Sequence, residues 1–153
     1  MRFTILCVGK IKEAYMQAAI KDYMTRLTKY AKVSIVEVPE DNHPVMEKRI
    51  EKEGEALLKK ITPGSCVVAL DLHGKEISSE KFAEYFKEKT VSGVSEFVFV
   101  IGGSDGIDKK ITKIADMRLC LSPMTFTHQM TRLILAEQLY RAMKINNGEQ
   151  YHK

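Results

Sequence analysis

Hydrophobic and polar residues follow two different periods along the chain, and the two periods alternate from one end to the other. Short apolar or alternating runs predict strands at Phe3–Val8, Val33–Val38, Cys66–Leu72, Phe97–Ile101 and Met117–Leu121. Apolar residues spaced three and four apart predict helices between them, at residues 13–30, 45–61, 79–89, 107–115 and 126–145. This order predicts one α/β domain over residues 1–153, with a mostly parallel sheet of five to six strands and helices on both faces.

The helix predicted at residues 45–61 carries a glycine on its apolar stripe, Gly54, which indicates a close packing contact. Its other face mixes charges of both signs, which favours a solvated surface over a binding patch, at Glu47, Lys48, Arg49, Glu51, Lys52, Glu53 and Glu55. In the next helix, Ser78 or Ser79 is the candidate N-cap.

Composition narrows the class of protein. Of the 153 residues, 44% are hydrophobic and 29% are charged, and the net charge is +4, which permits but does not require an acidic partner such as RNA. No apolar run is long enough to span a bilayer, and the first ten residues read as a strand rather than a signal peptide. Three dispersed cysteines predict buried thiols in a reducing cytoplasm, and neither they nor the four histidines have the spacing of a metal site.

Three loops follow predicted strand ends and should meet at the carboxyl edge of a parallel sheet, where ligands bind, at residues 70–75, 102–108 and 121–128. The second loop belongs to the segment FVFVIGGSDGID, residues 97–108. It has neither the Gly-Lys-Ser/Thr of a phosphate loop nor the dinucleotide fingerprint, and Asp105 and Asp108 disfavour a bound phosphate. Taken alone, its glycines favour a tight turn.

The third loop and the helix after it contain the densest set of functional side chains. Pro123 stiffens the loop, and Thr125 or Thr127 can cap the helix. On that helix His128 and Arg132 share a face, as do Glu137 and Arg141. An intrahelical ion pair explains Glu137 and Arg141 at least as well as catalysis does.

Several short motifs occur in register along the chain: VGK near residue 10, EKEGE around residues 52–55, LDLHGK at 70–75, FVIGGSDG at 99–106, SPMTFTHQMTRLILAEQLYRA at 122–142 and the terminal YHK. Together they resemble the RlmH (YbeA) family of SPOUT-class ribosomal RNA methyltransferases, over essentially the whole length. The resemblance implies a C-terminal trefoil knot, an exception to the usual rule against knotted chains.

The resemblance also implies S-adenosylmethionine as the cofactor, approached closely by the bare backbone at Gly102 and Gly103. The implied cofactor residues are Leu70, Gly102, Leu121, Ser122, Pro123, Met124, Thr125 and Phe126. Main-chain amides would read the adenine, and a cationic sulfonium would tolerate the nearby acidic side chains.

The activity implied by the resemblance is methylation of N3 of a pseudouridine in the helix-69 loop of 23S rRNA, on the large subunit or the whole ribosome, without a metal. The implied catalytic residues are His152 as a base, Tyr151 and Arg132, and the implied RNA contacts are Arg141, Lys153 and His128. Arg132, like Arg141 and Lys153, could also bind RNA phosphate at the surface. Lys153 stands where relatives often carry arginine, which keeps the charge but weakens bidentate contact. The alternative for this terminal segment is a frayed chain end.

A homodimer with its sites at the interface is expected from the resemblance and from the long apolar-faced helix at residues 126–145. Two other classes stay open on the residues alone. One is a non-catalytic RNA- or nucleotide-binding α/β domain. The other is a flavodoxin-like domain. Against that class, this sequence has no phosphate loop after its first strand.

Overall fold

A computed structural model describes residues 1–151 of the chain. Strands and helices alternate throughout, as the sequence pattern predicts: β1 (Arg2–Val8), α1 (Ala14–Leu27), β2 (Lys32–Val38), α2 (Met46–Leu58), β3 (Cys66–Glu76), α3 (Ser79–Val91), β4 (Glu96–Ile101), α4 (Lys109–Ile114), β5 (Met117–Cys120) and α5 (His128–Asn146). Every predicted element is present, and most boundaries differ from the prediction by no more than three residues.

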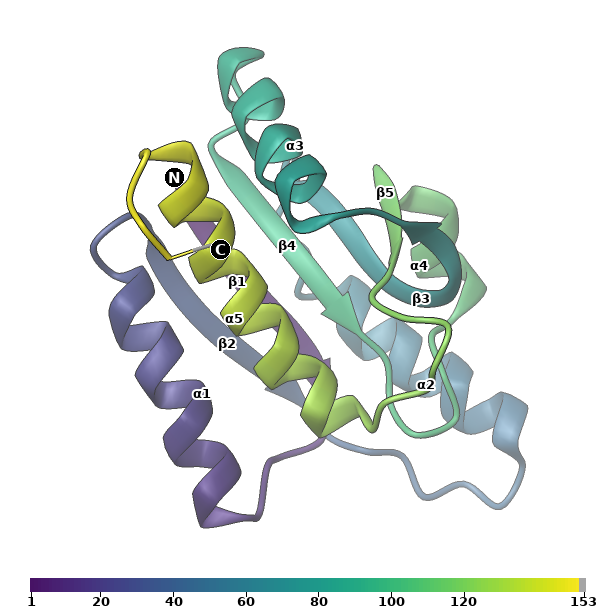
Figure 1. Cartoon of the computed structure of the whole chain (residues 1–153). Coiled ribbons are helices and arrows are strands. Elements are labelled where there is room, and N and C mark those ends of the chain that lie inside the picture. Colours follow the sequence, from purple (N-terminus) through teal and green to yellow (C-terminus); the bar gives the residue numbers. More distant parts are fainter. Residues whose placement is uncertain (152–153) are drawn as a thin grey trace.

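The five strands form one sheet in the order β2-β1-β4-β3-β5, and all of the neighbouring strands pair in parallel. Helices α1, α3 and α5 cover one face of the sheet, and α2 and α4 cover the other (Figure 1). The predicted α/β architecture is therefore confirmed, with five strands. The threading that would make the chain a trefoil knot stays a prediction.

Strand alternation divides the core between the two faces. Along β1, Phe3, Ile5 and Cys7 face the three-helix side, whereas Leu6 and Val8 face the two-helix side. The three-helix side also holds a cluster of phenylalanine rings with centroids 4.6–6.4 Å apart, contributed by Phe3, Phe82, Phe86, Phe97 and Phe99. All three cysteines are free and buried, as predicted.

Strand β3 departs from the prediction, because it continues to Glu76 instead of ending at Leu72. Its pairing with β5 breaks after Leu70 and resumes at Lys75, so residues 71–74 bulge out of the sheet. Gly74 makes this path possible, since a Cβ there would lie 2.6 Å from the backbone of Arg118. No pattern of apolar residues reports such a bulge.

Side-chain caps fix where several helices begin. Ser78 caps α3 by accepting a hydrogen bond from Lys81 N, and Thr127 caps α5 by accepting one from Met130 N. Each was one of two candidates in the sequence. No helix within residues 1–151 is both long and apolar enough to cross a membrane.

Candidate functional site

The three loops predicted to meet do so around one cavity of about 1070 Å³ at the carboxyl edge of the sheet. Strand β3 contributes Leu70 and the bulge that follows it, and the loop after β4 contributes residues 102–107. The loop between β5 and α5 supplies the remaining wall, with Leu121, Ser122, Met124, Thr125 and Phe126. Seven of the eight predicted cofactor residues therefore line one cavity, and Pro123 lies within the same loop.

The glycine loop is packed against itself, which corrects the expected reason for its glycines. A Cβ at Gly102 would collide with the carbonyl group of Gly106 and lie 2.9 Å from Cα of Ile107. Gly103 and Gly106 form an isolated bridge, and Gly106 has a φ of 109°. The next turn of the chain excludes a side chain at Gly102, while the Gly102 backbone still lines the cavity.

The wall between β5 and α5 combines a braced backbone with exposed apolar side chains. Ser122 accepts a hydrogen bond from Met124 N at 3.0 Å, and its carbonyl oxygen lies 3.1 Å from the thiol of Cys120. Met124 and Phe126 remain 74% and 37% exposed. Such a surface is suited to contact with the apolar faces of a flat heterocycle.

Acidic residues around the cavity are engaged by partners within the chain. Asp71 pairs with Arg118 (Oδ2 to Nε, 2.8 Å), and Asp105 pairs with Arg49 (Oδ2 to Nε, 2.7 Å). Asp108 caps α4 by accepting a hydrogen bond from Lys110 N. Because Asp71, Asp105 and Asp108 each have a role in the fold, these three acids carry no argument for a cationic ligand.

His128 lies at the first turn of α5 and lines the cavity. Its imidazole is 17% exposed, and Nε2 lies 3.7 Å from the Glu40 carboxylate, beyond hydrogen-bond distance. Nε2 has no hydrogen-bond partner within residues 1–151. In this described part of the chain, Nε2 is therefore a buried atom without a hydrogen bond, with the Glu40 carboxylate as its charged neighbour.

Arg132 lies one turn further along α5 and is completely buried. Its guanidinium donates to the carbonyl oxygens of Val8 and Gly9 at 2.7 and 2.6 Å, and to Glu37 Oε1 at 2.8 Å. It therefore ties α5 to the carboxyl ends of β1 and β2. A side chain enclosed in this way cannot touch RNA phosphate, which corrects the expectation of a surface contact for Arg132.

Tyr151 packs against the middle and second half of α5. Its ring stands edge-on to Tyr140, with centroids 4.9 Å apart, and the Arg141 guanidinium lies 4.8 Å from the Tyr151 centroid. The Tyr151 hydroxyl lies 3.2 Å from Glu137 Oε1 and 3.5 Å from the Tyr23 hydroxyl. Up to Tyr151, the terminal segment is docked and not frayed. His152 and Lys153 lie outside the described residues.

Glu137 and Arg141 form the intrahelical ion pair that was one of the two explanations for them. Arg141 Nε donates to Glu137 Oε1 at 3.0 Å, and both side chains are about one-fifth exposed. Arg141 thus lies at the surface beside Tyr151, whereas Arg132 on the same helix does not.

The two groups of predicted site residues lie on different parts of α5 within one chain. The first turn of α5 lines the cavity, whereas the chain folds back after the helix and places Tyr151 beside Glu137 and Tyr140, in the middle and second half of α5. From His128 to Glu137 the helix rises roughly 14 Å, at 1.5 Å per residue. The contacts of Tyr151 described above therefore include no residue that lines the cavity.

Sequence reasoning missed the contribution of α2 to this region. Arg49 pairs with the glycine loop, and Glu53 is only 6% exposed, so the predicted solvated face is wrong for these two residues. The predicted close contact at Gly54 is confirmed, since a Cβ there would lie 2.5 Å from Asp108. That glycine was the one available sign that this side of α2 meets another segment.

A second, smaller cavity of about 680 Å³ lies between α1 and the edge strand β2, lined partly by Lys10, Met24, Ile35 and Glu37. No group of three or more His, Cys, Asp or Glu side chains within residues 1–151 is arranged to hold a metal ion.

Comparison with known proteins adds to this geometry. A family model described as "Predicted SPOUT methyltransferase" matches residues 1–152. Three curated proteins, each named ribosomal RNA large subunit methyltransferase H, align with 100% of this chain and over 100% of their own length. They are 48% identical in Carboxydothermus hydrogenoformans, 48% in Alkaliphilus oremlandii and 47% in Acetivibrio thermocellus.

Two solved structures share the fold at low sequence identity. A probable methylase family protein from Haemophilus influenzae matches with a TM-score of 0.54 and 14% identity, over 99% of this chain and 70% of its own. A putative methyltransferase from Legionella pneumophila, determined with bound SAM, matches with a TM-score of 0.54 and 8% identity, over 93% of this chain and 66% of its own. At these identities the likeness concerns the fold alone.

Proposed function

Because this chain belongs to the SPOUT methyltransferase family, we propose that it transfers a methyl group from S-adenosylmethionine to ribosomal RNA of the large subunit. The observation that carries the proposal is the end-to-end alignment, at 47–48% identity, with three proteins named for that activity. In its finer form, the acceptor is N3 of the pseudouridine in the helix-69 loop of 23S rRNA, on the large subunit or the assembled ribosome. Such a substrate places the protein in the cytoplasm.

The cavity is compatible with S-adenosylmethionine in size and in lining. Its volume, about 1070 Å³, lies just above the range of about 300–1,000 Å³ for small-molecule sites. The exposed side chains of Met124 and Phe126 offer an apolar wall, and the glycine loop offers backbone N–H and C=O groups. Leu70, Gly102 and residues 121–126, Pro123 included, would hold the cofactor, which supplies an electrophilic methyl group.

The chain's own part in the reaction is to hold the base beside the cavity and to manage the N3 proton. Positioning is the larger contribution, because alignment converts a bimolecular step into an effectively unimolecular one. We assign proton acceptance to His152, orientation of the base to Tyr151, and phosphate contact to Arg141 and Lys153. His128, which lines the cavity, is a further RNA-contact candidate. For Arg132 we propose a positioning role through its bonds to β1 and β2.

A homodimer would resolve the separation of the two half-sites. Tyr151 docks beside Glu137 and Tyr140 and not on the cavity of its own chain, so the terminal segment would complete the cavity of a second copy. The rim of the cavity also carries large apolar side chains that one chain leaves exposed, namely Tyr15, Leu72, Met124, Phe126 and Met130. Sedimentation that reports a monomer at working concentrations would contradict this proposal.

Two measurements test the function in order. Calorimetric titration with S-adenosylmethionine should show saturable binding, and labelled methyl should pass from it to ribosomes that lack the modification. Binding to ribosomes without cofactor binding would instead indicate a non-catalytic RNA-binding domain. Mapping the labelled nucleotide then decides between the helix-69 pseudouridine and another position in the large-subunit RNA.

A further inference from the structure

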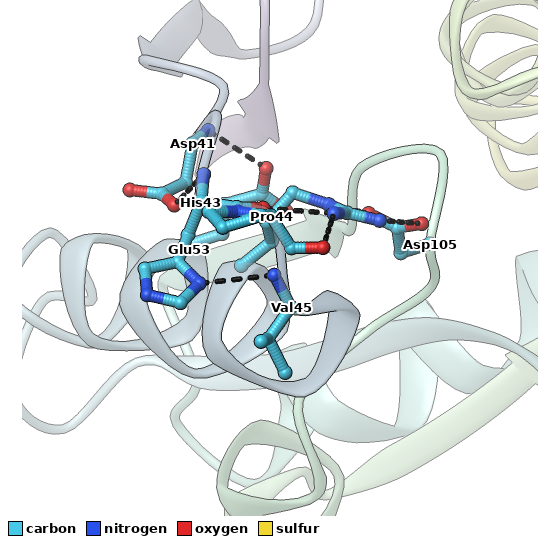
Figure 2. A network of polar contacts seen from close by, with 7 residues as sticks. Asp41, His43, Pro44, Val45, Glu53 and Asp105 are labelled. Carbon is cyan, nitrogen blue, oxygen red and sulfur yellow. Dashed lines mark hydrogen bonds and ion pairs between the residues drawn. The ribbon is translucent and has the colours of Figure 1, made fainter.

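Helix α2 contacts the glycine loop at three points on the side facing away from the cavity. The first contact is a fork-shaped ion pair, in which Arg49 donates from Nε to Asp105 Oδ2 at 2.7 Å and from Nη2 to Asp105 Oδ1 at 3.1 Å (Figure 2). The remaining nitrogen, Nη1, donates to the carbonyl oxygens of His43 and Pro44 at 2.8 and 3.3 Å. One guanidinium therefore connects the glycine loop, α2 and the loop that precedes α2.

Glu53, one turn after Arg49, forms the second contact. Its Oε1 accepts a hydrogen bond from Asp41 N at 3.0 Å (Figure 2), and its Oε2 lies against Gly103, where a Cβ would be only 2.7 Å away. Burial raises the pKa of Glu53, the Asp41 N–H lowers it, and the carboxylates of Asp105, Glu40 and Asp41 raise it further. Oε2 is buried and has no hydrogen-bond partner within residues 1–151, so its contact with Gly103 is one of packing.

The third contact joins Gly54 to Asp108, the N-cap of α4. Asp108 is 8% exposed and lies where a side chain at position 54 would have to be. The glycine loop is thus fixed at residues 103, 105 and 108 by three positions of α2, two of which share one turn. An exposed, solvated helix face would make no such contacts.

From these contacts we propose that Arg49 and Glu53 are positioning residues, which hold the glycine loop in the conformation that binds the cofactor without touching the cofactor themselves. The inference rests on the proposed function, since it assigns the conformation of one wall of the same cavity to α2. Neither side chain lines the cavity, whereas their targets Gly103 and Asp105 do.

The expected effect follows from how conformation and affinity are linked. When only a fraction of molecules has the binding-competent loop, the apparent dissociation constant rises by the reciprocal of that fraction. Loss of the Arg49 fork should leave about one molecule in ten competent, so the dissociation constant for S-adenosylmethionine should rise about tenfold. Bound cofactor restores the loop, so kcat at saturating cofactor should stay within about twofold.

The test compares Arg49→Gln and Asp105→Asn, singly and together, with Lys110→Gln as the matched control. The Lys110 side chain also joins α4 to α2, through Glu51 and Glu55 at 3.7 and 3.8 Å, but it is 51% exposed. Only the backbone N–H of Lys110 bonds to the glycine loop, at Asp108, and glutamine keeps that N–H. The Lys110→Gln substitution removes the same charge from the same side of the molecule and should leave cofactor affinity unchanged. Arg49→Lys keeps the charge without the fork and should recover the affinity only in part.

Calorimetry measures the dissociation constants, and amide hydrogen exchange of residues 102–108 reports the loop directly. The expected result is weaker binding and faster exchange in both single variants, with no further loss in the double variant, because the two groups act on each other. Unchanged affinity in Arg49→Gln, or additive losses in the double variant, would overturn the inference. A wild-type protein that binds no S-adenosylmethionine would refute the proposed function instead, and the exchange rates would still decide whether α2 holds the loop.

Discussion

The amino-terminal end of α5 and the terminal segment that follows the helix carry the two halves of the proposed site, and different kinds of interaction hold them in place. At the amino-terminal end, the completely buried guanidinium of Arg132 joins the helix to two backbone carbonyls and Glu37. The terminal segment folds back along α5, where ring contacts and ion pairs near the surface hold Tyr151 and Glu149.

The difference matches what each end would have to do. A cavity wall must keep one geometry, and a completely buried arginine whose Nη1 and Nη2 make three hydrogen bonds is costly to displace. A terminal segment that meets RNA on a second copy must adapt to it, and surface ion pairs are worth little and are screened by salt. The cavity end is therefore expected to be rigid and the terminal end easily rearranged.

The largest effect is expected from Arg132→Ala, which would leave Glu37 and two carbonyl oxygens without their donor. Breaking a buried, hydrogen-bonded ion pair costs about 3–5 kcal/mol, so the free energy of unfolding should fall by that amount. Arg141→Ala on the same helix removes a half-buried pair with Glu137 and should cost no more than about 1 kcal/mol. Urea denaturation measures both, and similar losses in the two variants would contradict the contrast between the ends.

Second in size is removal of residues 151–153, which should lower methyl transfer to unmodified ribosomes at least about 100-fold, or about 2.7 kcal/mol of activation free energy. Cofactor affinity should stay within about twofold, because Tyr151 contacts Tyr140, Tyr23 and Glu137 and not the cavity. Labelled methyl transfer and calorimetry give the two values. Full activity after the deletion would move catalysis to His128 and the cavity.

Gly102→Ala should have an intermediate effect on stability. Its Cβ would collide with the Gly106 backbone, and displacing well-packed atoms costs about 1–3 kcal/mol. The same displacement should weaken cofactor binding, since this backbone lines the cavity. Gly64→Ala is the control. Gly64 has a φ of 79°, which strains an alanine, but no atom lies near its Cβ position and it does not line the cavity. A Gly102→Ala protein that binds normally would remove the loop from the cofactor site.

Sequence alone was sufficient for the architecture and for most of the cavity. Strand alternation and helix periodicity depend on burial, and every run of that kind formed the expected element. The cavity was predictable because parallel strands bring their following loops to one edge. The prediction was wrong for three charged residues, which it placed at the surface: Arg132, Arg49 and Glu53. Their partners come from other segments of the chain, so the local pattern of residues did not reveal them.

The glycine loop shows a related limit. A glycine is expected wherever a ligand or another part of the backbone comes close to the chain. The presence of glycine in the sequence does not show which of the two is nearby. The atoms that exclude a side chain at Gly102 belong to Gly106 and Ile107, only four and five residues away. The tight-turn explanation is the one the geometry supports for that position.

The smallest effect, and the most specific to the terminal end of α5, is the pH dependence of Glu149. Hydrogen bonds from Lys144, Lys29 and Tyr30 lower the pKa of Glu149 to about 2. Because the folded pKa lies below the ordinary value of 4.5, this carboxylate stabilises the fold at pH values above 4.5, and the contribution is lost as the pH falls toward 2. The difference in urea midpoint between wild type and Glu149→Gln should therefore be present at pH 7 and shrink between pH 4.5 and pH 2. The difference in urea midpoint should also shrink in 1 M salt, where surface ion pairs are screened. If the difference changed with neither pH nor salt, Glu149 would stabilise the fold by packing instead.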